Sequence, residues 1–209
     1  MSTPVELDGR RQRSRRTRAR IVDAAGQLFL RQGYVATTIE SVADRAGVAV
    51  QTVYYVFGTK PNLLSAVLDA AIVGDAEPVP VVARTWVDDL AKADDAAAAV
   101  THLLESAMAI VARTAPIYGV LRQAAADPEV GALLARTRRA RRVDQRRLVE
   151  ILDTAGHLAN NIDVDIAADV VYGLVNEEVF ELLVVDCGWD LDRFQRWATT
   201  AVQRELIDS

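Results

Sequence analysis

Residues 37–64 read TTIESVADRAGVAVQTVYYVFGTKPNLL, and this stretch decides the fold. Thr37 and Glu40 have the spacing of a capping box, which predicts that a helix starts there. A second short helix, roughly residues 50–57, follows after a tight turn. A helix-turn-helix needs a small residue between its helices, a glycine in its turn and a branched apolar residue under its second helix, and the sequence supplies Ala43, Gly47 and Val53. The second helix of such a unit lies in the major groove of DNA.

A more specific signature surrounds this unit. It consists of Ala46-Gly47-Val48, then Thr52-Val53-Tyr54-Tyr55-Val56-Phe57-Gly58-Thr59-Lys60, then Leu63-Leu64. These residues resemble the DNA-binding domain of TetR-type transcriptional regulators, and the motif covers about a quarter of the chain. Two positions depart from the pattern: many members carry histidine in place of Val56, and serine in place of Ala49, where it caps the recognition helix. The departures affect individual contacts and not the fold that the resemblance implies.

The composition of the 209-residue chain is that of a helical protein, rich in alanine and poor in proline and glycine. Cys187 is the single cysteine, and no clustered Cys/His spacing is present, which argues against a disulfide, a zinc site or a redox role. The N-terminus lacks the apolar core of a signal peptide, and no apolar run reaches the length of a membrane span. We therefore expect a cytoplasmic protein without cofactor, metal or membrane partner.

The net charge of −5 hides an uneven distribution. Residues 1–60 carry a net charge of +5, and residues 61–209 carry −10. A basic N-terminal part on an acidic body suits a protein that presents one end to phosphate, although chance unevenness is an alternative.

The sequence predicts an all-α protein of two domains. Residues 1–15 are expected to form a disordered basic arm, residues 16–74 the helix-turn-helix domain with a connecting helix, and residues 75–209 a helical domain for effector binding and dimerisation. The segment Gly74–Pro80 is expected to be a loop. The helices expected beyond residues 37–57 span about residues 16–33, 60–73, 83–91, 94–113, 116–126, 128–154, 164–186 and 191–206.

Position on the recognition helix selects the candidate DNA contacts. Tyr54 and Tyr55, near its exposed end, are the expected phosphate contacts, and the alternative is that one of them belongs to the core. Gln51 and Thr52 suit base edges, where glutamine pairs with adenine and the threonine methyl packs on the thymine methyl. The remaining candidates are Val50 for apolar contact with a base, and Thr38 and Lys60 for the DNA backbone, with the helix N-terminus at Lys60 also favouring an anion.

Two arginine-rich runs lie outside this unit. The run Arg10–Arg20 contains seven arginines, and Arg15 and Arg16 are candidate DNA contacts. The arm lies along phosphates or enters the minor groove, as arms in other DNA-binding folds do, or it is a solvated tail. The run Arg136–Arg147 also contains seven arginines; a solvated helix face, some of whose arginines pair with nearby acidic helices, is favoured over a second nucleic-acid surface.

Residues between 83 and 172 supply a possible apolar chamber for a ligand. The candidate ligand contacts are interior-capable residues with some chemistry: Trp86, His102, Met108, Tyr118, Arg122 and Tyr172. Each of them is individually more typical of core or surface. His157 is expected on the surface, and two histidines without a Ser-His-Asp or Cys-His arrangement give no basis for catalysis.

The last two long helices are the candidate dimer interface. The segment Ile166–Val185 is apolar on more than one side, which is typical of a helix buried on several faces. In the family that this sequence resembles, these helices form a four-helix interface between subunits, and two half-sites of an operator favour a twofold dimer. The alternative is an intrachain core. The candidate interface residues are Val171, Leu174, Val175, Phe180, Phe194, Trp197 and Val202.

The resemblance implies a homodimeric regulator, most often a repressor, that binds a pseudo-palindromic operator and releases it when a small molecule binds. The helix from Lys60 to Val73 would then transmit the change between the two sites. Three alternatives remain open: an effector-independent DNA-binding protein controlled by a protein partner, an activator, and an enzyme with an accessory DNA-binding head.

Overall fold

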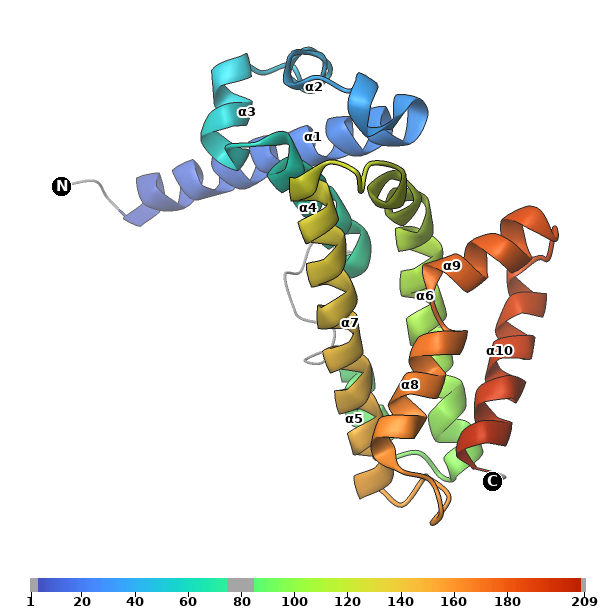
Figure 1. Cartoon of the computed structure of the whole chain (residues 1–209). Coiled ribbons are helices and arrows are strands. Elements are labelled where there is room, and N and C mark those ends of the chain that lie inside the picture. The colour runs from blue at the N-terminus through green and yellow to red at the C-terminus, as the bar shows by residue number, and fades with distance from the viewer. Residues whose placement is uncertain (1–3, 75–84, 208–209) are drawn as a thin grey trace. The chain divides into compact units, whose positions relative to one another are not determined.

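The structure is a computed structural model that describes residues 4–74 and 85–207, with side chains from Gln12 and from Trp86 onward in the two ranges. All secondary structure assigned in these ranges is helical, which confirms the all-α class. The elements (Figure 1) are α1 (Pro4–Ala36), α2 (Ile39–Ala46), α3 (Val50–Phe57), α4 (Lys60–Val73), α5 (Thr85–Leu90), α6 (Ala96–Gln123), α7 (Pro128–Thr154), α8 (Val164–Leu174), α9 (Glu177–Phe180), a π-helical segment (Glu181–Asp186) and α10 (Leu191–Leu206).

The described residues form two compact units. Unit 1 contains the residues up to Ala70 together with Ile117–Leu133, and unit 2 contains Ala71–Pro116 and the residues from Leu134 onward. The chain therefore passes between the units three times, each time within a helix: in α4, in α6 and in α7. The sequence predicted domains that are each continuous in the chain, whereas unit 1 also includes Ile117–Leu133 from the second half of the chain. Apart from Gly74, the predicted loop of residues 74–80 lies outside the described residues.

The start of α2 corrects the predicted cap by one residue. Thr38, not Thr37, is the N-cap: its side chain accepts a hydrogen bond from the Ser41 amide at 3.1 Å, and the Ser41 side chain accepts one from the Thr38 amide at 3.2 Å. Thr37 is fully buried and donates its hydroxyl to the Gly33 carbonyl at 2.8 Å. Both threonines have a polar residue three positions on, so burial of Thr37 decides which one caps the helix.

Gly47 ends α2 as predicted. Its φ of 62° lies in the left-handed region, and its amide donates to the carbonyls of Ala43 and Asp44. A Cβ atom at this position would lie 2.9 Å from the Arg20 guanidinium. The following helix, α3, buries Val53 and Phe57, so the predicted helix-turn-helix is confirmed in its elements and its inward residues.

The N-terminal arm corrects another expectation. The predicted disordered segment of residues 1–15 is helical from Pro4, as the first part of α1. Arginine and glutamine are good helix formers, so a run without apolar periodicity extends a helix that is anchored further along the chain. Gly33, with φ 78° and ψ 173°, interrupts α1 where the sequence predicted its end.

In the second half of the chain, some of the observed helices match the predicted ones and others do not. The predicted α7 and α10 are confirmed. The two helices expected on either side of Pro116 are one continuous helix, α6, because proline removes a single backbone donor and its ring lies on the exposed side. The single helix expected over residues 164–186 is broken: Asn176 has φ −149° and ψ 169°, and its side chain accepts from the Val179 amide to start α9.

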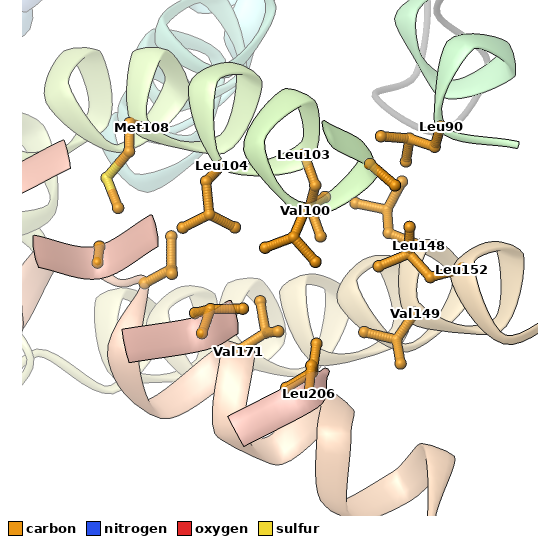
Figure 2. Packing of buried hydrophobic residues seen from close by; sticks show 14 of the residues in the cluster. Leu90, Val100, Leu103, Leu104, Met108, Leu148, Val149, Leu152, Val171 and Leu206 are labelled. Atoms are coloured by element: carbon orange, nitrogen blue, oxygen red, sulfur yellow. The ribbon is translucent and has the colours of Figure 1, made fainter. Parts of the chain in front are cut away.

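The core of unit 2 joins α6, α7, α8 and α10. Figure 2 shows Leu103, Leu104 and Met108 from α6 lying toward Leu148, Leu152 and Val171, with Leu206 beside them. By length and composition alone α6 is the one helix among the described residues that would suffice to cross a membrane, and several of its apolar residues belong to this core. An apolar helix of this kind is also what a buried core requires.

Candidate functional site

The recognition helix α3 brings together five of the predicted DNA contacts. Tyr55 is 91 % exposed and Tyr54 is 49 % exposed, so neither tyrosine belongs to the core. Gln51 is also exposed, and Val50 and Thr52 are half-buried. Because Val53 and Phe57 face inward at a four-residue spacing, the remaining positions of the helix present a polar and aromatic surface to solvent.

Two arginines of α1 hold the helix-turn-helix in place. The Arg18 guanidinium lies 4.6 Å from the centroid of the Phe57 ring, at the end of α3. The Arg20 guanidinium donates to the carbonyls of Ala46 and Gly47, which are among the unpaired carbonyls at the end of α2. The position of α3 is therefore fixed from α1 at both the turn and the far end.

Thr38 and Lys60, predicted to touch the DNA backbone, have partners inside the unit. Thr38 caps α2, as described above. The Lys60 ammonium donates to the carbonyls of Tyr34 and Thr37 at 3.0 and 3.1 Å, and it lies 4.1 Å from the centroid of the Tyr34 ring. Burial lowers the pKa of Lys60. Burial also raises the pKa of Tyr34 to about 12, helped by nearby acidic residues of unit 1. Lys60 thus fastens the start of α4 to the corner between α1 and α2.

Arg15 and Arg16 are exposed on α1, upstream of the two anchored arginines. In Figure 1 the N-terminal half of α1 extends beyond α3. Both side chains therefore offer a guanidinium group to solvent.

The predicted ligand contacts are divided between the two units. Tyr118 and Arg122 belong to unit 1, where Tyr118 is buried. In unit 2, Met108 is part of the apolar core and Trp86 packs against it. His102 is exposed, with its Nδ1 3.9 Å from Glu105, so it faces solvent and not an interior chamber. Tyr172 is half-buried beneath Arg141, whose guanidinium lies 5.2 Å from its ring.

A buried polar cluster in unit 2 was missed by the sequence reasoning. Glu177, only 7 % exposed, accepts the Thr114 hydroxyl at 2.9 Å and forms an ion pair with Arg141. Next to it, Glu178 accepts from Arg138 at 2.8 Å and lies 4.0 Å from Arg141. The signal in the sequence was the pair of glutamates in an otherwise apolar segment, facing an arginine-rich helix.

The arginines of α7 pair with the acidic residues of α8 and α9. Arg142 lies 2.6 Å from Asp169, and Arg146 pairs with Asp165. This confirms the prediction that some arginines of the run Arg136–Arg147 pair with acidic helices nearby. Part of this arginine run therefore forms ion pairs within unit 2. Because these pairs are exposed, each of them contributes little to stability.

The candidate dimer residues lie largely inside the single chain. Val171, Val175, Phe180, Phe194 and Val202 are at most 8 % exposed, and Leu174 and Trp197 are half-buried against the same core. Large apolar side chains that remain exposed over the same part of the chain are Ile166, Leu182, Val185 and Leu191, each more than half exposed.

Other reactive residues are isolated. Within residues 4–74 and 85–207, no three His, Cys, Asp or Glu side chains are grouped as a metal site would require. Cys187 is exposed and His157 is half-buried.

Comparison with known proteins places these features in context. Residues 21–67 match the family model described as bacterial regulatory proteins of the tetR family. Over 166 residues the chain is 30 % identical to the uncharacterized HTH-type transcriptional regulator YdeS of Bacillus subtilis (strain 168), covering 78 % of each chain.

Solved structures share the fold. FadR from Bacillus subtilis, in complex with stearoyl-CoA, superposes with a TM-score of 0.68 at 19 % identity, over 88 % of this chain and 96 % of that one. NalD, the secondary repressor of the MexAB-OprM multidrug efflux pump in Pseudomonas aeruginosa, superposes with a TM-score of 0.67 at 21 % identity, over 92 % and 98 %. At these identities the likeness concerns the fold alone.

Proposed function

This chain belongs to the TetR family of bacterial transcriptional regulators, and we propose that it is a repressor that binds a pseudo-palindromic operator as a homodimer and releases it when a small molecule binds. The observation that carries the DNA-binding part is the surface of α3. Tyr54, Tyr55 and Gln51 are exposed on a helix whose other face is anchored by Val53 and Phe57. A helix held in this way keeps its outward residues in a fixed register against the major groove.

Two subunits are part of this proposal because one short recognition helix buries little area on DNA. A twofold dimer doubles the contacts and matches a palindrome. The exposed apolar residues Ile166, Leu182, Val185 and Leu191 support an interface on α8, the π-helical segment and the start of α10. In this proposal the buried residues predicted earlier form the core that supports the interface.

Effector release requires that unit 2 responds to a ligand and that the response reaches α3. Arg113 of α6 donates to the carbonyls of Ala71 and Ile72, the end of α4, at 3.1 and 3.3 Å. A ligand that displaces α6 would therefore also displace the end of α4. The first residue of α4, Lys60, is hydrogen-bonded to the carbonyls of Tyr34 and Thr37, between α1 and α2. Such a ligand acts only if it prefers the geometry that does not bind DNA.

FadR, which shares this fold, is solved in complex with stearoyl-CoA, and this supports a small molecule with an apolar part as effector. The alternative, an effector-independent DNA-binding protein controlled by a protein partner, has no specific observation in its favour. The same holds for an activator and for an enzyme. As a transcription factor the protein would act in the cytoplasm.

The test is a footprint of the purified protein on its own promoter region across a series of salt concentrations. A protected palindrome with a steep salt dependence, weakened by Tyr55→Ala, supports operator binding. Screening small apolar molecules for release of that footprint then tests the effector. Protection without sequence preference, or protection that no compound alters while a protein partner does, would contradict the repressor mechanism.

A further inference from the structure

The run Arg10–Arg20 contains seven arginines, and two of them, Arg15 and Arg16, are exposed on α1. From the sequence, this arm enters the minor groove, lies along phosphates or is a solvated tail. The structure bears on the first of these, because α1 is helical from Pro4. A helix with its side chains is about 10–12 Å wide, whereas the minor groove of B-DNA is only about 6 Å wide. The helical arm therefore does not fit into the minor groove.

The five arginines between residues 13 and 20 form two rows at helical spacing. One row contains Arg15 and Arg18, and the other contains Arg13, Arg16 and Arg20. The last arginine of each row contacts the helix-turn-helix: Arg18 lies over Phe57 at the end of α3, and Arg20 donates to the turn after α2. Both rows thus have a fixed register relative to the recognition helix.

The arginines that precede Arg18 and Arg20 in their rows lie on the same helix, nearer its N-terminus. Arg16 and Arg13 precede Arg20 by four and seven residues, which is about 6 and 10 Å along the helix axis at 1.5 Å per residue. Phosphates follow one another every 3.4 Å or so along the axis of one strand, so a span of this length faces about two or three of them. Arg15 and Arg16 are exposed, with no fold element over them among the described residues.

We propose that the N-terminal half of α1 is a rigid cationic rod that binds the phosphate backbone beside each half-site and leaves the minor groove empty. The proposal rests on the operator binding proposed above and adds the place and the chemistry of a second contact. Because phosphates carry no sequence information, the rod contributes affinity and salt dependence but no base preference.

The test measures salt dependence with the full-length protein on its footprinted operator. Each lost phosphate contact reduces the slope of log K against log salt by about 0.9, so Arg15→Gln/Arg16→Gln, which removes two charges per subunit, should reduce it by about 3 to 4 in a dimer. The preference for operator over scrambled DNA should be unchanged. An unchanged slope would overturn the rod.

Two controls address the helix and the groove. Thr17→Pro keeps every charge but breaks the helix just after Arg15 and Arg16, so it should reduce the slope nearly as much as the double glutamine variant, whereas Thr17→Ala should not. A Thr17→Pro variant that binds like the parent would show that a flexible tail suffices. Replacing the A·T pairs that flank the half-sites by G·C should leave binding unaltered; a loss that depends on Arg15 and Arg16 would indicate minor-groove contact instead.

The same titration on a random-sequence duplex separates this proposal from the repressor itself. If the parent protein protects no operator, the repressor proposal fails, yet the rod is still supported by a slope on random DNA that falls in Arg15→Gln/Arg16→Gln. If the operator is protected and neither duplex shows a change in slope, only the rod is wrong.

Discussion

Tyr55 and Lys60 are five residues apart in the sequence and have opposite surroundings. Tyr55 is 91 % exposed, while the Lys60 ammonium is engaged by two carbonyls and an aromatic ring. Both were predicted to contact DNA because of their place in the motif. The position of Lys60 in the motif predicts that it lies near the DNA-facing surface. It does not predict that the carbonyls of Tyr34 and Thr37 accept hydrogen bonds from its ammonium group. The one-residue shift of the cap from Thr37 to Thr38 has a similar origin, since tertiary burial selects between two equivalent threonines.

Tyr55→Ala should weaken operator binding about tenfold, equivalent to about 1.4 kcal/mol, because it removes the phosphate contact proposed for this exposed side chain. Its free energy of unfolding should stay within about 0.5 kcal/mol of the parent value, as is usual for exposed positions. Fluorescence anisotropy with labelled operator and urea denaturation measure the two quantities. Parent-like affinity would exclude Tyr55 from the interface.

Lys60→Ala should lower the free energy of unfolding by about 1–3 kcal/mol, because it leaves the carbonyls of Tyr34 and Thr37 without their charged donor. Urea denaturation gives this value. Any loss of operator affinity in this variant then reflects the stability of the corner as well as lost charge, so Tyr55→Ala is the cleaner probe. A variant as stable as the parent would leave phosphate binding as the role of Lys60.

At the scale of the element, the sequence did not predict the break between α8 and α9. An apolar run over residues 164–186 predicts one helix, and hydrophobic periodicity does not register the buried charge of Glu177. The ion pair with Arg141, the Thr114 hydroxyl and the Asn176 cap together favour a new helix start. By contrast α7, α10 and the helix-turn-helix were predictable because their caps and apolar faces agree with one another.

Removal of one member of the buried ion pair should be costly. Arg141→Met leaves the Glu177 carboxylate buried without its cation and should lower the free energy of unfolding by about 3–5 kcal/mol. The double variant Arg141→Met/Glu177→Met should recover most of that loss, because neither charge remains to be compensated. Chemical denaturation of the two variants tests this, and a double variant as unstable as the single one would contradict it.

The neighbouring Glu178 gives a pH dependence. Burial favours its neutral form, but the hydrogen bond from Arg138 and the charge of Arg141 outweigh burial and hold the pKa of Glu178 below its usual 4.5. A depressed pKa stabilises the folded state above the unfolded-state pKa, and this contribution is lost as the pH falls through the folded-state value. The parent should therefore exceed Glu178→Gln in stability by about 0.5–1 kcal/mol at pH 7, and the difference should shrink as the pH falls below 4.5 and through the lower folded-state pKa.

Thermal denaturation of the parent and of Glu178→Gln from pH 3 to pH 8 measures this difference. A constant difference across the whole range would mean that Arg138 and Arg141 do not hold Glu178 in its charged form.

At the scale of the whole molecule, the sequence supports two units but not their composition or the subunit interface. Interface and core are both apolar, so the composition of residues 164–206 does not separate them. The proposed interface rests on exposure instead, since Leu182 and Val185 are exposed while Val171 and Phe194 are covered. The six candidate effector contacts stay a prediction, because no local motif defines a pocket and side chains far apart in sequence must meet to form one.

Leu182→Glu/Val185→Glu should convert the proposed dimer into a folded monomer, because charged side chains would have to be desolvated in the interface. Sedimentation velocity measures the mass and circular dichroism the helix content. Val143→Glu is a matched control, since Val143 is an exposed apolar residue of α7 outside the proposed interface, and it should stay dimeric. A dimeric Leu182→Glu/Val185→Glu variant would place the interface elsewhere.

The three passages of the chain between the units have a consequence for recombination. Because α4, α6 and α7 each carry residues of both units, no single crossover point separates the unit that contains the helix-turn-helix from the other unit. A fragment ending at Gly74 would lack Ile117–Leu133, a segment whose Tyr118, Leu121 and Val130 are buried in the intact protein. Replacing unit 2 by that of another protein therefore requires exchanging residues 71–116 and 134–209 together, with each junction placed inside a helix and in phase with its turns.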